Sequence, residues 1–118
     1  MCGFLKGTPK PFDVAQHAGP STDLLIRSAS LGRALAVHLG QASVVLMRGH
    51  GFTAVGRDVP EATYRAIYAA RNCEIALQAA QLGTPVYLSD GEADACEVTV
   101  AGQVGRAWEL WCREIELS

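Results

Sequence analysis

The stretch of sequence that decides the fold runs from residue 44 to residue 56: Val44-Val45-Leu46-Met47-Arg48-Gly49-His50-Gly51-Phe52-Thr53-Ala54-Val55-Gly56. Two apolar runs are joined here at a Gly-His-Gly corner. The first run is short and begins with two valines, which favours a buried strand over a helix. Glycines on both sides of His50 permit positive φ, so the chain can turn sharply and hold the imidazole at a strand end. Such a corner suits a metal ligand or a catalytic group, and equally an ordinary tight turn.

Length and composition indicate one globular domain spanning residues 1–118. The hydrophobic content is 49% and the charged content is 19%, as in globular proteins that bury a core. The formal net charge is -2, and lysines and arginines are scattered along the chain rather than clustered. We therefore expect neither a nucleic acid nor an anionic membrane as a partner.

The cysteines lie far apart and form no CxxC pair: Cys2, Cys73, Cys96 and Cys112. This spacing argues against a zinc finger or a disulfide scaffold and indicates reduced thiols in a cytoplasmic protein. Cys73 and Cys112 fall inside helical patterns, where we expect them to fill the core. Lys6 and Pro9 interrupt the apolar start, so we expect no signal peptide, and no apolar run is long enough to span a bilayer.

Several elements are expected before the corner. Residues 12–14 form a short strand candidate after the extended segment around Pro9 and Pro11. Thr22 and Asp23 are good helix N-cap residues, so a helix is expected from residue 24 to residue 39, with a possible break at residues 28–30. Gly40 is its natural C-cap.

After the corner, Asp58, Pro60 and Glu61 predict the start of a long helix that ends at Gly83. Its alanine-rich face could meet a sheet or another subunit, and Tyr64 and Tyr68 share a face that favours packing. Ser89 has capping-box spacing ahead of a short helix through Ala95. Residues 98–105 are ambiguous between helix and coil. An amphipathic helix is expected at residues 106–117, carrying on one stripe Trp108, Trp111, Cys112 and Ile115.

His50 is the one candidate that residue type alone brings forward. A zinc site needs three or four protein ligands, and the sequence contains neither HxH nor HExxH, so the residues alone favour a turn histidine. His17 in a loop and His38 near a helix C-terminus are interpreted as structural. Arg48 could reach an anion or a carboxylate, although a solvated arginine at a strand end is the simpler interpretation. Composition and spacing alone predict an α/β domain and do not identify its function.

An ordered series of motifs nevertheless resembles the C-terminal half of the class II aldolase/adducin family. The series comprises Thr22-Asp23-Leu24-Leu25-Ile26-Arg27, Leu31-Gly32-Arg33-Ala34-Leu35-Ala36, Leu39-Gly40, Val44 to Gly51, Val55-Gly56-Arg57, Pro60-Glu61-Ala62, Leu82-Gly83 and Tyr87-Leu88-Ser89. It covers roughly residues 11–95, and the order is more specific than any single motif. The resemblance implies a layered α/β/α fold with a central, mostly antiparallel sheet, here truncated at the N-terminus.

The resemblance also implies a metal-dependent lyase or a related epimerase or decarboxylase acting on a small sugar phosphate or hydroxy acid. His50 matches the third metal histidine of the family, and the metal, usually zinc, would stabilise an enediolate as a Lewis acid. The family's HxH pair, acidic general acid/base and phosphate-binding loop have no counterpart here, so no catalytic residue is assigned. We therefore expect this chain alone to be inactive.

The same resemblance leaves two functions open. One is the C-terminal part of such a lyase, and Arg48 before the His-Gly pair is a slight indication of a decarboxylase branch. The other is a non-catalytic, adducin-like interaction module in which His50 is a relic. Both imply a homo-oligomer, commonly a tetramer. A truncated sheet favours association because it exposes a strand edge and an apolar face.

Overall fold

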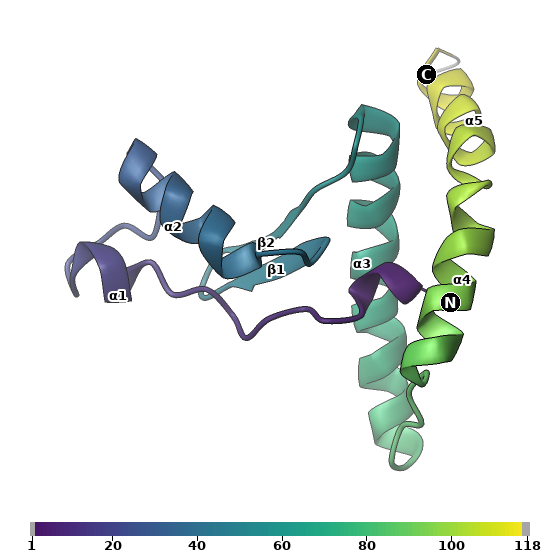
Figure 1. Ribbon diagram of the computed structural model, residues 1–118, viewed down its shortest axis with the longest axis horizontal. Coiled ribbons are helices and arrows are strands. Elements are labelled where there is room, and N and C mark those ends of the chain that lie inside the picture. Colours follow the sequence, from purple (N-terminus) through teal and green to yellow (C-terminus); the bar gives the residue numbers. More distant parts are fainter. Residues whose placement is uncertain (1, 117–118) are drawn as a thin grey trace.

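The computed structural model describes residues 2–116 and shows a mixed α/β fold that is mostly helical (Figure 1). In chain order its elements are η1 (Gly3–Leu5), α1 (Ala15–Ala18), α2 (Ala29–Leu39), β1 (Val44–Met47), β2 (Gly51–Ala54), α3 (Val59–Leu82), α4 (Asp90–Ala101) and α5 (Val104–Glu116). No helix among the described residues is long and apolar enough to cross a membrane.

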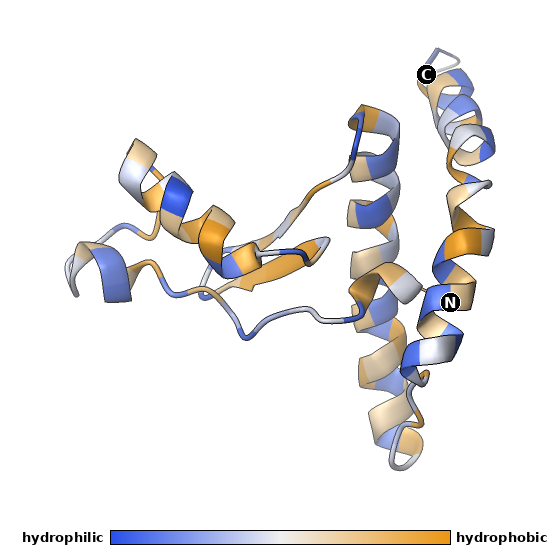
Figure 2. Cartoon of the chain, in the orientation of Figure 1, coloured by the Kyte–Doolittle hydropathy of each residue, from blue (hydrophilic) through white to orange (hydrophobic). Residues whose placement is uncertain are grey.

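The predicted hairpin is confirmed. β1 pairs antiparallel with β2 in a register that runs from Val44↔Ala54 to Met47↔Gly51. Gly49 has φ +71° and Gly51 has φ +150°, so both glycines use the freedom that the turn requires. Figure 2 shows β1 to be hydrophobic, which agrees with its position between helices.

The predicted strand at residues 12–14 forms only one bridge, from Phe12 parallel to Met47. The Phe12 N–H donates to the Leu46 carbonyl at 2.7 Å, and the Arg48 N–H donates to the Phe12 carbonyl at 2.9 Å. The chain then continues into α1, so the prediction of a strand is wrong at Asp13 and Val14. Within residues 2–116 the larger central sheet is also not formed, because the only sheet there has two strands.

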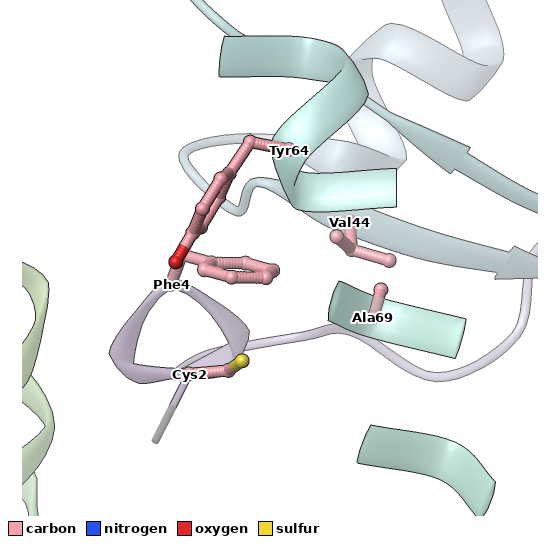
Figure 3. Close-up of a cluster of buried hydrophobic side chains, with 5 residues drawn as sticks. All are labelled: Cys2, Phe4, Val44, Tyr64 and Ala69. Atoms are coloured by element: carbon pink, nitrogen blue, oxygen red, sulfur yellow. The ribbon is translucent and has the colours of Figure 1, made fainter. Parts of the chain in front are cut away.

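Successive side chains of β1 point to opposite faces of the hairpin, and the hydrophobic core is therefore divided into two clusters, one on each face. Val44, on one face, packs with Cys2 and Phe4 from the N-terminal segment and with Tyr64 and Ala69 of α3 (Figure 3). Val45, on the other face, packs with Phe12 and Val14, and residues of α2 surround this second cluster. Neighbouring residues of one strand thus anchor two different sets of helices.

The long helix α3 begins as predicted. The Glu61 N–H donates to the Asp58 side chain at 2.8 Å, which caps the helix, and Pro60 occupies its first turn. The helix ends at Leu82, and Gly83 follows it. The Tyr64 and Tyr68 rings lie 4.4 Å apart, and the Tyr64 ring also meets Trp111 of α5 at 6.2 Å, so the predicted aromatic packing is confirmed.

The helix expected from residue 24 begins later, at Ala29, with Ser28 as its N-cap. The Thr22 and Asp23 side chains instead accept the N–H groups of Leu24 and Leu25, each at 3.1 Å. These short local bonds form tight turns that compete with helix capping. Leu24 accordingly adopts φ +65°, outside the helical region.

At the C-terminal side, Ser89 and Glu92 form the predicted capping box. The helix that they begin is longer than expected, because α4 continues to Ala101 and α5 starts at Val104. The ambiguous residues 98–105 are thus mostly helical. Leu117, in the last predicted helix, lies outside the described residues. Cys73 is exposed, so its assignment to the core is wrong, whereas Cys2 is buried.

Candidate metal-binding corner

His50 lies at the tip of the hairpin, in the turn between β1 and β2. Its N–H donates to the Met47 carbonyl at 3.1 Å, and its side chain is exposed. A Cβ on Gly49 would lie 2.9 Å from Leu24 Cδ1, so the turn also packs closely against the segment before α2. The local backbone therefore fixes the position of His50 while leaving its imidazole accessible.

Arg48 stands beside the corner and is held by a carboxylate. Its Nη2 lies 2.9 Å from Asp13 Oδ1, and 54% of the Arg48 side chain is exposed. The bond from Arg48, reinforced by the Ala15 N–H, outweighs desolvation and holds the pKa of Asp13 below its usual value. Of the two roles considered for Arg48, the structure shows the pairing with a carboxylate.

The rings of the other two histidines, His17 and His38, pack against the Phe12 ring. The His17 ring stacks on the Phe12 ring at 5.1 Å, and the His38 ring meets its edge at 5.4 Å. His38 Nε2 also lies 2.7 Å from the Lys10 carbonyl oxygen. These contacts agree with the structural interpretation of both residues, although His17 lies in α1 and not in the predicted loop.

The described residues do not supply a full set of ligands for a metal ion. Among residues 2–116, no group of three or more histidine, cysteine, aspartate or glutamate side chains is placed to hold one. His50 can offer one imidazole nitrogen, which is fewer ligands than a zinc site uses. The described residues therefore do not fit a metal ion by themselves.

The sequence interpretation missed a charged cluster at the opposite end of the hairpin. Glu61 is only 6% exposed, yet it is fully paired. Its Oε2 accepts the Arg57 N–H at 2.7 Å and the Arg57 Nε–H at 2.9 Å, and its Oε1 lies 3.1 Å from Arg65 Nη2. Burial opposes ionisation, but the Arg57 and Arg65 contacts outweigh it and hold the pKa of Glu61 below its usual value.

Arg65 links this carboxylate to the rest of the fold. Its Nη1 donates to the Val55 carbonyl at 2.8 Å and its Nη2 to Glu97 of α4 at 3.1 Å. Its guanidinium carbon also lies 5.9 Å from the centre of the Phe4 ring. The spacing of Arg57, Glu61 and Arg65 at successive i,i+4 positions was a signal for this cluster, whereas nothing in the sequence marked Glu97 as a partner.

A family model described as "Class II Aldolase and Adducin N-terminal domain" matches residues 2–77, which include the hairpin and most of α3. The chain belongs to this family. Its aldolase-type members are metal-dependent. The chain is also similar to "Decarboxylase tropJ" of Talaromyces stipitatus, with 38% identity over 137 residues. This match covers 98% of the chain and 52% of that relative, so the chain spans about half the relative's length.

Proposed function

We propose that this chain is part of a metal-dependent carbon–carbon lyase of the class II aldolase type, with His50 as one metal ligand. The observation that carries the proposal is an exposed imidazole on a fixed, glycine-flanked corner inside the region that matches the family. Because one imidazole is too few for zinc, the remaining ligands would come from polypeptide other than the described residues.

Within that class, decarboxylation of a small hydroxy acid is favoured over aldol cleavage of a sugar phosphate. The support is the similarity to a relative whose name describes a decarboxylase. Arg48 agrees with this choice only weakly, because its guanidinium is already paired with Asp13. No step of the reaction is assigned to this chain, since its described residues do not complete the metal site.

We also propose that the hairpin belongs to a larger, mostly antiparallel sheet between helical layers. The support is that Val44 and Val45 pack against helices on opposite faces of the hairpin. A two-stranded sheet by itself is only marginally stable in water, so further strands would stabilise it.

The experiment is to isolate the tagged protein from its host together with every chain that accompanies it. Metal is measured by mass spectrometry, and carbon–carbon cleavage is measured as labelled CO₂ or aldehyde released from hydroxy acids and sugar phosphates. We expect near-stoichiometric metal and turnover, both lost in His50→Ala. The matched control, His38→Ala, should retain both because the His38 ring rests on Phe12 and the Lys10 carbonyl.

Metal content that is unchanged in His50→Ala would contradict the assignment of the ligand. A stable assembly with neither metal nor turnover would instead favour the alternative, an adducin-like interaction module. The apolar side chains exposed on α3, among them Ile75 at 60% and Leu77 at 70%, give that alternative its support. Reading the DNA upstream of the Met1 codon for an HxH motif provides an independent test of the lyase proposal.

A further inference from the structure

Two cysteines from distant parts of the chain meet on one wall of a groove beside α3. The lining of this groove includes Cys2, Ala69, Asn72 and Cys73. Cys2 is the residue that precedes η1, whereas Cys73 lies in the middle of α3. The proposed lyase function uses neither thiol, so their proximity calls for a separate explanation.

The Cys2 sulfur is held on α3 by contacts within the fold. Cys2 packs with Ala69 in a buried cluster, and its sulfur is directed toward α3 (Figure 3). Asn72 Nδ2 donates to Cys2 Sγ at 2.8 Å. The same Nδ2 group donates to the Tyr68 carbonyl at 2.7 Å, which fixes the amide on the helix. These contacts place the sulfur over the turn of α3 between residues 69 and 72.

Cys73 lies beside that turn. It follows Asn72 directly and stands four residues after Ala69, and helix residues at i and i+4 have Cβ atoms about 5–6 Å apart. A disulfide needs Cβ atoms roughly 3.5–4.5 Å apart, so a small displacement of Cys2 brings the two residues within range. Cys2 can move without disturbing α3, because its carbonyl bonds to the Leu5 N–H within the N-terminal segment.

We infer that Cys2 and Cys73 form a reversible disulfide when the protein meets a hydroperoxide. The Cys73 thiolate attacks a peroxide oxygen and becomes a sulfenic acid, and the O–O bond breaks to release an alcohol or water. The Cys2 sulfur then attacks the Cys73 sulfur. The S–S bond forms, the S–O bond breaks, and the departing hydroxide takes the Cys2 proton to leave as water. Two thiols are oxidised for each hydroperoxide reduced.

The environments of the two thiols set this order. Burial raises the pKa of the Cys2 thiol, so little of it is thiolate at neutral pH and it reacts slowly with peroxide. The Cys73 side chain lies on an exposed part of α3, where peroxide can reach it. Cys73 is therefore the thiol that is oxidised first, and Cys2 is the thiol that resolves it.

The bond would join the N-terminal segment to α3 and enclose nearly all of the family-matched residues 2–77. Closing so long a loop restricts the unfolded chain more than the folded one. The equilibrium constant for unfolding should therefore be about tenfold lower, or lower still, in the oxidised protein than in the reduced protein. Oxidation would thus stabilise the packing of η1 on α3.

The first test maps the bond in the tagged protein, isolated with every chain that accompanies it. After mild treatment with hydrogen peroxide, the remaining thiols are alkylated and the protein is digested without reduction. We expect a linked pair of peptides that carry Cys2 and Cys73, released by dithiothreitol. Cys73→Ser should abolish the pair. Cys112→Ser is the matched control on α5 and should retain it, and circular dichroism checks that both variants fold.

The second test follows the order of the steps and the effect on stability. In Cys2→Ser the resolving thiol is missing, so dimedone should trap sulfenic acid at Cys73 several-fold more than in the wild type. Urea unfolding then compares oxidised with reduced protein. Peroxide should lower the unfolding equilibrium constant of the wild type about tenfold and leave that of Cys73→Ser unchanged.

Three results would overturn the inference. One is that peroxide leaves Cys2 and Cys73 unlinked in the folded protein. Another is that either residue pairs instead with Cys96, Cys112 or a second chain. The third is that the bond forms equally fast in urea-unfolded protein, which would mean that the fold does not bring the thiols together. Because none of these measurements involves metal or turnover, they can fail independently of the proposed lyase function.

Discussion

The two ends of the hairpin place a titratable side chain in contrasting environments, one buried and paired and the other exposed. At the end next to α3, Glu61 is 6% exposed and every partner it needs is in place. At the opposite end, His50 is exposed on a turn whose geometry two glycines define. A buried, fully paired charge serves the fold, because any change leaves a partner unsatisfied. An exposed imidazole on a fixed backbone contributes little to the fold and remains available to a ligand.

The largest effect should come from Glu61→Gln. This change removes the negative charge between Arg57 and Arg65, so the free energy of unfolding should fall by about 3 kcal/mol, as in other broken buried pairs. Urea unfolding measures the loss. Glu74→Gln is the control, because its pair with Arg71 is exposed and should change stability very little. Equal losses in the two variants would contradict a structural role for the buried cluster.

The same contrast predicts a dependence on pH. The pKa of Glu61 is lowered in the folded protein, so its contribution to stability is fully present above the unfolded value of about 4.3 and is lost as pH falls through the folded value. The difference in the free energy of unfolding between the wild type and Glu61→Gln should therefore be constant near neutral pH and shrink below about pH 4. Urea unfolding between pH 6 and pH 3 measures it, and a difference that does not shrink would contradict the argument.

Elements whose signals are local were predicted well from the sequence. The hairpin follows from its valines and paired glycines, and the start of α3 follows from Asp58, Pro60 and Glu61. The segment before α2 was predicted wrongly because the Thr22 and Asp23 side chains can cap a helix or close a tight turn, and residue type does not decide between them.

Features that depend on distant parts of the chain could not be predicted in this way. Glu97 meets Arg65 only because α4 folds back over the start of α3, and the sequence gives no signal for that approach. Cys73 was assigned to the core because it lies in a helical pattern, but its side chain lies on an exposed part of α3. For the candidate site, sequence identified His50 and its corner, while the structure supplied the partner of Arg48.

A smaller effect is expected at the turn itself. Gly49→Ala should lower the free energy of unfolding by more than the about 1–2 kcal/mol that a φ of +71° costs a residue with a side chain, because the new Cβ would also press on Leu24. Gly7→Ala is the matched control: its φ is +70°, but nothing lies within 4 Å of the added Cβ. Thermal unfolding compares the two variants. Equal losses would show that the contact with Leu24 contributes nothing and that only the backbone conformation matters.

The smallest effect on stability should come from His50→Ala. The backbone bond from residue 50 to the Met47 carbonyl survives the change, and the imidazole is exposed, so stability should stay within about 0.5 kcal/mol of the wild type. Urea unfolding alongside Glu61→Gln measures this directly. A loss comparable to that of Glu61→Gln would mean that the His50 ring supports the fold, and the contrast between the two ends would fail. Unchanged stability with lost metal in the assembled protein would instead assign this end of the hairpin to ligand binding.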